Sequence, residues 1–187
     1  MKHPELHRHL LAPLALVVAL AGTSCGAVDF DVTSTVPETV LAGDPTTCTL
    51  NKLLERAPVN PFVLEVDLER ETKARDTGPA DRVELKSMSL AITPTRQPAG
   101  DVDDFDFLLS LEVFVESARA GSPLPRVKVA ELTSVPRGAA QIAVNAVPGV
   151  DLLPYINEGA RLTSSARGST PCDDTSLAGS VVVTLMF

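Results

Sequence analysis

Short runs of alternating apolar and polar residues, separated by proline and glycine, dominate this chain. In residues 62–69 every second side chain is apolar, which is the period of a strand with one buried face. Eight segments show this strand pattern: 28–33, 62–69, 83–93, 111–117, 126–132, 140–144, 161–166 and 176–187. No long amphipathic helix alternates with them, which disfavours an α/β fold. We predict an all-β, antiparallel two-sheet sandwich of immunoglobulin type, with an up-and-down or Greek-key barrel as the alternative.

One or two short helices, and in addition a single helical turn, are expected between these strands. Leucines at i, i+3 and i+4 predict about two helical turns in residues 49–56, and residues 104–109 suggest a single turn. Residues 151–159 predict another short helix, with Asp151 as its N-cap and Gly159 as its stop.

Two further details of local structure follow from the pattern. The strand 83–93 changes phase between Leu85 and Met88, which predicts a β-bulge near Lys86 and Ser87. Tyr155 is the only tyrosine. We interpret it as a half-buried ring that closes one end of the sandwich, with its hydroxyl bonded to backbone, rather than as a ligand contact.

The first 24 residues have the order of a secretory signal. Lys2 and Arg8 form a basic start, residues 10–21 are almost all apolar, and small residues lead to Cys25. The apolar run is shorter than the roughly 20 residues that a membrane-spanning helix needs. We therefore expect a signal peptide over 1–24 and a single domain over 25–187.

The segment Gly22-Thr23-Ser24-Cys25 resembles the lipobox of bacterial prolipoproteins. In that family the cysteine thiol receives a diacylglyceryl group, the signal is cut just before it, and the new amino end is acylated. The resemblance implies a lipid on Cys25 and cleavage after Ser24, although Gly22 stands where the family favours leucine. The alternative is an ordinary signal cut after Ala21, which leaves Cys25 as a plain thiol.

Two other resemblances refine the expectation. In lipoproteins of this kind an aspartate after the lipidated cysteine retains the protein in the inner membrane, so Gly26 implies the outer membrane. The last third of the chain orders a short helix, a strand, a proline-containing loop and an apolar strand. That order resembles immunoglobulin-like sandwiches of the late-embryogenesis-abundant type.

Composition excludes several classes of function. The formal net charge is −8, and it becomes −9 once Lys2, Arg8 and Glu5 leave with the signal. Nucleic acid is therefore not an expected partner, and membrane contact should come through the lipid on Cys25 alone. All three histidines (His3, His7 and His9) lie in the signal. Histidine-based catalysis and metal binding are thus not expected, and we predict a protein that is not an enzyme and has no cofactor.

Residues 101–106 hold the densest group of carboxylates. They offer a weak calcium candidate made of Asp101, Asp103, Asp104 and Asp106, because calcium takes several converging oxygens. The spacing does not match an EF-hand loop, so we favour a solvated loop that caps a turn. The pair Asp173-Asp174 receives the same interpretation.

The three cysteines predict one bridge. Lipidation of Cys25 leaves Cys48 and Cys172, and cysteines of exported proteins usually pair, so we predict a disulfide between them; free thiols are the alternative.

The leading functional hypothesis is a non-enzymatic, lipid-anchored envelope protein with a structural or protein-interaction role and an unknown protein partner. The alternative is a carrier of an apolar ligand or lipid, with a cavity lined by residues such as Phe62, Leu64, Leu111 and Phe114.

Overall fold

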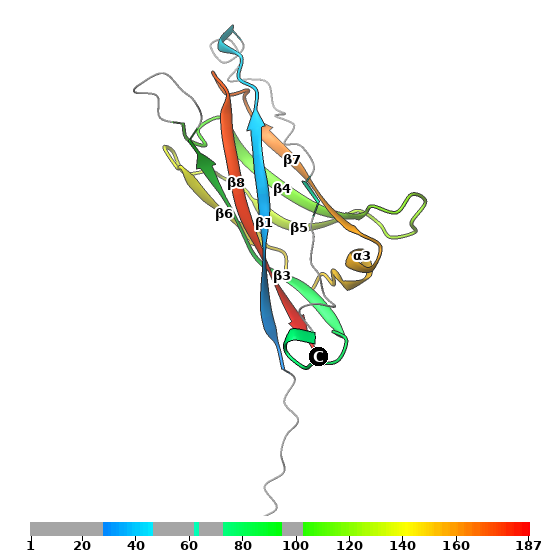
Figure 1. The fold of residues 1–187 in the computed structure, drawn as a ribbon. Helices are drawn as coiled ribbons and strands as arrows, with labels where there is room; N and C mark the ends of the chain where they lie inside the picture. The colour runs from blue at the N-terminus through cyan, green and yellow to red at the C-terminus, as the bar shows by residue number, and fades with distance from the viewer. Residues whose placement is uncertain (1–27, 47–61, 64–72, 95–102) are drawn as a thin grey trace, which may run out of the picture.

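The computed structural model describes residues 28–46, 62–63, 73–94 and 103–187 (Figure 1). Within these residues the strands and the helix follow the order β1 (Phe30–Leu41), β2 (Phe62–Val63), β3 (Arg82–Thr93), β4 (Leu108–Ser117), β5 (Val127–Leu132), β6 (Gln141–Ala146), α3 (Leu153–Asn157), β7 (Ala160–Gly168) and β8 (Thr175–Met186).

The strands form one curled antiparallel sheet in the order β1-β8-β3-β6-β5-β4-β7-β2. The predicted all-β, antiparallel class is confirmed, but the predicted division into two sheets is not seen. The reason is the contact between β5 and β6, where Ala130 pairs with Ala146 and Glu131 pairs with Asn145. This short ladder joins the half that contains β1, β8, β3 and β6 to the half that contains the other four strands.

The edge strand β1 is longer than its sequence pattern indicates. Val36 and Pro37 suggest a break, yet β1 continues to Leu41 with a register shift between Val36 and Thr39. Proline is tolerated here because an edge strand has one side without ladder hydrogen bonds. In β3 the predicted bulge is confirmed, since the register against β8 shifts between Leu85 and Ser87.

The predicted helices have three different outcomes. The segment 49–56 lies outside the described residues, as does most of the predicted strand 62–69. The prediction of a helical turn at 104–109 is wrong. There the Leu108 amide donates to the Phe105 carbonyl at 2.9 Å, which makes a tight turn, and β4 begins at Leu108.

The helix predicted after Asp151 is present as α3, but its cap differs. Leu152 occupies the N-cap position and makes no side-chain cap. The Asp151 carboxylate instead accepts hydrogen bonds from the amides of Leu153, at 3.0 Å, and of Val83, at 3.1 Å. It thereby ties α3 to β3. Gly159 ends the helix with a φ of 80°, a conformation that favours glycine.

Buried side chains from both halves of the sheet form a single core. Val83, Val113, Val129 and Leu185 are fully buried, and they come from β3, β4, β5 and β8. The prediction for Tyr155 is confirmed in its main point, because the ring is buried and the hydroxyl donates to the Pro125 carbonyl at 2.8 Å.

The molecule is elongated, with two poles at the ends of β1 and β8 (Figure 1). One pole holds the start of β1 at Phe30 and the last residue, Phe187. The other holds the end of β1 at Leu41 and the start of β8 at Thr175, which pair with each other. Twelve residues of strand separate the poles by about 40 Å. We call them the Phe30 pole and the Leu41 pole.

Gly179 lies where β8 closely approaches β3, and this contact generates a prediction. A Cβ atom at this position would lie 2.3 Å from the Ser89 carbonyl oxygen of β3. We expect Gly179→Ala to lower the free energy of unfolding by about 2 kcal/mol, because the strands must separate. The matched control is Gly78→Ala, since a Cβ at Gly78 meets nothing within 4 Å, and a change within about 0.5 kcal/mol is expected. Equal denaturation midpoints of the two variants would contradict the close packing.

Candidate functional site

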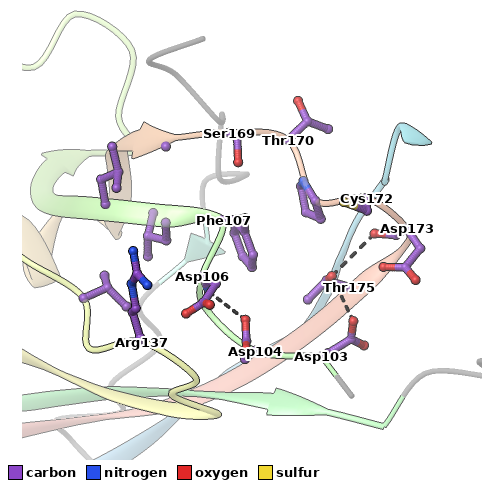
Figure 2. A pocket seen from close by; sticks show the side chains of 15 residues that line it. Asp103, Asp104, Asp106, Phe107, Arg137, Ser169, Thr170, Cys172, Asp173 and Thr175 are labelled. Carbon is purple, nitrogen blue, oxygen red and sulfur yellow. Dashed lines mark hydrogen bonds between the residues drawn. The ribbon is translucent and has the colours of Figure 1, made fainter. Parts of the chain in front are cut away.

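An open cleft of about 720 Å³ lies at the Leu41 pole (Figure 2). Its walls come from three segments that are distant in the sequence: the turn before β4, the loop around Val135 and Arg137, and the loop that joins β7 to β8. Figure 2 shows Phe107 between the acidic turn and the Ser169–Thr170 side of the cleft. Leu109, whose side chain is 62% exposed, adds an apolar surface.

The acidic residues of the cleft hold its loops in place. One Asp104 oxygen accepts from the Asp106 amide at 2.8 Å, and one Asp106 oxygen accepts from the Gly138 amide at 2.7 Å. The buried Thr175 hydroxyl lies 3.4 Å from both an Asp103 carboxylate oxygen and the Asp173 carbonyl. These contacts fit the preferred interpretation of residues 101–106 as a loop that supports a turn.

The loop between β7 and β8 is fixed on two sides. Toward β4, the Ser169 amide donates to the Phe107 carbonyl at 2.7 Å. Toward the end of β1, the Gly43 amide donates to an Asp174 carboxylate oxygen at 3.0 Å, and the Asp44 amide donates to the Pro171 carbonyl at 2.9 Å. Asp174 is thus a structural acceptor as well as a polar loop residue.

Gly43 allows this contact with the β7–β8 loop. A Cβ atom on it would lie 2.0 Å from the backbone of Asp173, so a larger residue would push the two segments apart.

The predicted cysteine sites are described only in part. Cys172 lines the cleft and is disulfide-bonded. Cys25 and Cys48 lie outside the described residues, so the lipidation of Cys25 and the pairing of Cys48 with Cys172 stay predictions.

The calcium candidate gains no support from the geometry. Asp101 lies outside the described residues. The carboxylates of Asp103, Asp104 and Asp106 accept hydrogen bonds from three different groups: the Thr175 hydroxyl, the Asp106 amide and the Gly138 amide. In the part of the chain that the structure describes, no three His, Cys, Asp or Glu side chains come together as a set that could hold a metal ion.

The charges of the cleft favour the binding of a partner with basic groups over one with acidic groups. Among the described residues that line the cleft, four bear carboxylates (Asp103, Asp104, Asp106 and Asp173) and one, Arg137, bears a guanidinium. Hydroxyl groups of Ser169, Thr170 and Thr175 add hydrogen-bonding capacity. The sequence singled out the aspartates, but nothing in it indicated Arg137 or the hydroxyl-bearing loop, because only the folded sheet brings them together.

The side chains proposed for an apolar carrier cavity do not share one face. Leu111 is 1% exposed and points into the core. Phe114 lies on the other face of β4, where the Arg126 guanidinium covers its ring at 3.6 Å from the centroid. The expectation that Leu111 and Phe114 line a common cavity is therefore wrong. Leu64 and the side chain of Phe62 lie outside what the structure describes.

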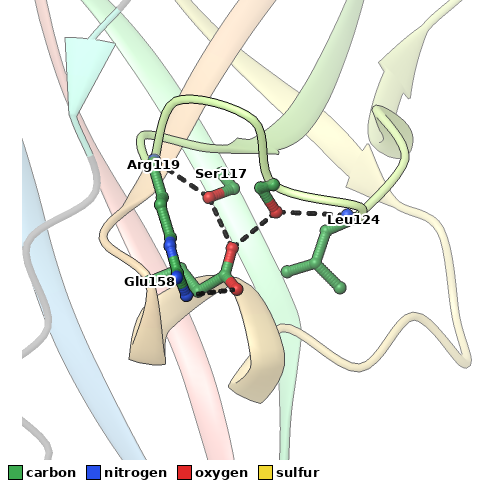
Figure 3. Close-up of polar contacts among 5 residues, drawn as sticks. Ser117, Arg119, Leu124 and Glu158 are labelled. Carbon is green, nitrogen blue, oxygen red and sulfur yellow. Dashed lines mark hydrogen bonds and ion pairs between the residues drawn. The ribbon is translucent and has the colours of Figure 1, made fainter.

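A second polar cluster, which the sequence did not indicate, surrounds Glu158 at the end of α3 (Figure 3). One Glu158 oxygen accepts from the hydroxyls of Ser122, at 2.5 Å, and Ser117, at 2.7 Å. The other lies 3.6 Å from the Arg119 guanidinium. Because Ser122 in turn accepts from the Leu124 amide, the cluster attaches the β4–β5 loop to α3.

Comparisons with known proteins add no functional assignment. The sequence matches no protein-family model, and no curated protein matches it. Among the described helices, none has the length and apolar character that crossing a bilayer requires.

The Glu158 cluster predicts a pH dependence of stability. Hydrogen bonds from Ser122 and then Ser117, with the charge of Arg119, lower the pKa of Glu158 below its ordinary value. A carboxyl whose folded pKa is depressed stabilises the fold above its unfolded pKa, and that contribution is lost as the pH falls through the folded pKa. We expect Glu158→Gln to reduce the loss of stability on acidification from neutral pH, measured by urea unfolding.

A double-mutant cycle with Ser122→Ala provides the control. Since the Ser122 hydroxyl is the main cause of the lowered pKa, Glu158→Gln should change the pH dependence less in the Ser122→Ala background. Identical pH profiles for the wild type and Glu158→Gln would argue against the cluster.

Proposed function

We propose that this protein is a non-enzymatic lipoprotein, held in the cell envelope by a lipid on Cys25 and acting as a structural or protein-interaction module. The observation that carries the proposal is the order of the first 25 residues: a basic start, an apolar run too short to span a membrane, and small residues before Cys25. Gly26, where an aspartate would favour the inner membrane, makes the outer membrane the proposed location.

The position of β1 supports an interaction role. Phe30, the first residue of β1, follows Cys25 by only five residues, which span at most about 18 Å. A lipid on Cys25 would therefore keep the Phe30 pole near the membrane. The cleft at the Leu41 pole would then face away from the bilayer and stay open to a partner. Its excess of carboxylates suits a protein segment that carries lysine or arginine.

The alternative, a carrier of apolar ligands, has less support. Leu111 and Phe114 lie on opposite faces of β4, and the cleft combines apolar side chains with four carboxylates. Such a lining suits a charged partner better than a lipid chain.

The immunoglobulin-like sandwich remains as an interpretation within this proposal. Only two residue pairs join β5 to β6, and buried side chains from both halves of the sheet share one core. The curled sheet is thus compatible with two facing layers joined at this seam.

Cys25→Ser tests the anchor. We expect the variant to lose the lipid and move from the detergent-rich to the aqueous phase in a phase-partition assay, while its denaturation midpoint stays within about 0.5 kcal/mol of the wild type. Mass spectrometry of the mature amino end gives the direct measurement. Ser24→Thr, which keeps a small residue before the cysteine, serves as the matched control and should stay lipidated. A wild-type mature chain that begins at Gly22 and has no lipid mass would refute the proposal.

Chain lengths favour Cys48 as the partner of Cys172. Asp44, bonded to the residue before Cys172, precedes Cys48 by four residues, which span at most about 14 Å. Cys25 lies within about 18 Å of Phe30, and β1 separates Phe30 from the Leu41 pole by about 40 Å. Cys48 is thus the cysteine that can bring its Cα within about 7 Å of Cys172, as a disulfide requires.

We therefore expect the unreduced, denatured mature protein to expose no reactive thiol once Cys25 is lipidated. Reduction should lower the free energy of unfolding by up to about 5 kcal/mol, because the bridge closes a loop of about 124 residues. The double variant Cys48→Ser/Cys172→Ser should reproduce the reduced protein and respond no further to reductant. Two reactive thiols in the unreduced wild type would rule out the bridge.

A further inference from the structure

We infer that the Phe30 pole rests on the phospholipid surface and inserts its aromatic edge between the headgroups, so that the lipid on Cys25 is not the sole membrane contact. This inference rests on the proposed function, because the lipid on Cys25 brings the pole to the bilayer.

The pole carries a compact group of apolar and cationic side chains. The rings of Phe30 and Phe187 stack, with centroids 5.4 Å apart and 19° between their planes. The Arg75 guanidinium lies over the Phe30 ring at 4.1 Å from its centroid. Both rings pack against the core on one side and remain partly exposed on the other, and Val28 is 59% exposed.

The length of chain between this group and the lipid leaves little freedom. Two residues, Gly26 and Ala27, lie between Cys25 and Val28, so the Cα atoms of Cys25 and Val28 are at most about 11 Å apart. The interface between headgroups and acyl chains is itself several ångströms thick, and amphipathic surfaces insert about 5–10 Å into it. The exposed edges of Val28, Phe30 and Phe187 are thus within reach of that layer whenever Cys25 is anchored.

The chemistry of the group suits a phospholipid interface. Phenyl rings gain by leaving water, and a guanidinium pairs with a phosphate through two parallel hydrogen bonds. Asp29 and Asp76 are exposed and directly adjoin Phe30 and Arg75 in the chain, and the exposed Asp81 donates its amide to the Met186 carbonyl, so net positive charge is not the source of attraction. We therefore expect contact with a zwitterionic surface of phosphatidylethanolamine and phosphatidylcholine, without a need for anionic lipid.

The protein contains no tryptophan, so one introduced indole reports on a single position. The lipidated Phe187→Trp variant is reconstituted into phosphatidylethanolamine–phosphatidylcholine vesicles, with or without brominated acyl chains. The matched control is Val40→Trp, because Val40 is 56% exposed near the other end of β1. Bromolipid should quench about half of the Phe187→Trp emission, since an indole at the interface contacts the acyl chains, and it should leave Val40→Trp unchanged.

A charge reversal provides a second measurement. Adding Arg75→Glu to Phe187→Trp should reduce the bromolipid quenching, whereas adding Arg167→Glu, an exposed arginine on β7, should not. Circular dichroism of each variant confirms that it is folded.

The outcomes separate this inference from the proposed function, because mass spectrometry reads lipidation independently. A lipidated Phe187→Trp protein that is quenched no more than Val40→Trp overturns the inference and leaves the anchor standing. Equal effects of Arg75→Glu and Arg167→Glu also overturn it. An unlipidated mature chain overturns both, because nothing then brings the pole to the bilayer.

Discussion

The hydrogen-bonded ladders on the two sides of β8 organise the rest of the molecule. β8 pairs with β1 from Phe30 to Leu41 and with β3 from Arg82 to Thr93, so three twelve-residue strands run side by side. Both ladders are interrupted at one point, between Val36 and Thr39 and between Leu85 and Ser87. Between these bulges the backbones approach so closely at Gly179 that the position has no room for a side chain. These ladders set the distance between the poles and bring the ends of β1 and β8 together beside the cleft.

The sequence predicted the positions of individual strands and bulges better than it predicted which strands pair with each other. Alternation located most strands, and a phase change located the bulge of β3, because both follow from which side chains face the core. No pattern in the sequence indicated that β5 pairs with β6. This pairing involves two residue pairs, and the same alternating pattern serves a strand in one curled sheet or in two separate sheets. The turn at Phe105 was misread as helical because acidic residues before an apolar run are also typical of helix starts.

The residues of the cleft were likewise predicted only where they are adjacent in the sequence. Asp103, Asp104 and Asp106 were recognised because they are adjacent in the sequence, but their chemistry depends on the partners that the fold supplies. Arg137 and Thr175 come from segments thirty or more residues away and had no motif to mark them. Glu158 was missed for a related reason: its two serine partners, at the end of β4 and in the β4–β5 loop, come near it only through the packing of α3.

The arrangement of the two poles gives the proposed anchor a mechanical consequence. A flexible tether would let a domain sample every orientation, whereas the two residues between Cys25 and Val28 would allow a domain anchored at Cys25 little beyond tilting. β1 starts at the Phe30 pole and ends at Leu41, and the residues that follow it, Gly43 and Asp44, contact the β7–β8 loop. A lipid on Cys25 would therefore act on the orientation of the cleft through β1 rather than through a hinge. A partner that docks at the Leu41 pole would meet the cleft about 40 Å from the bilayer, a height fixed by the number of residues in β1.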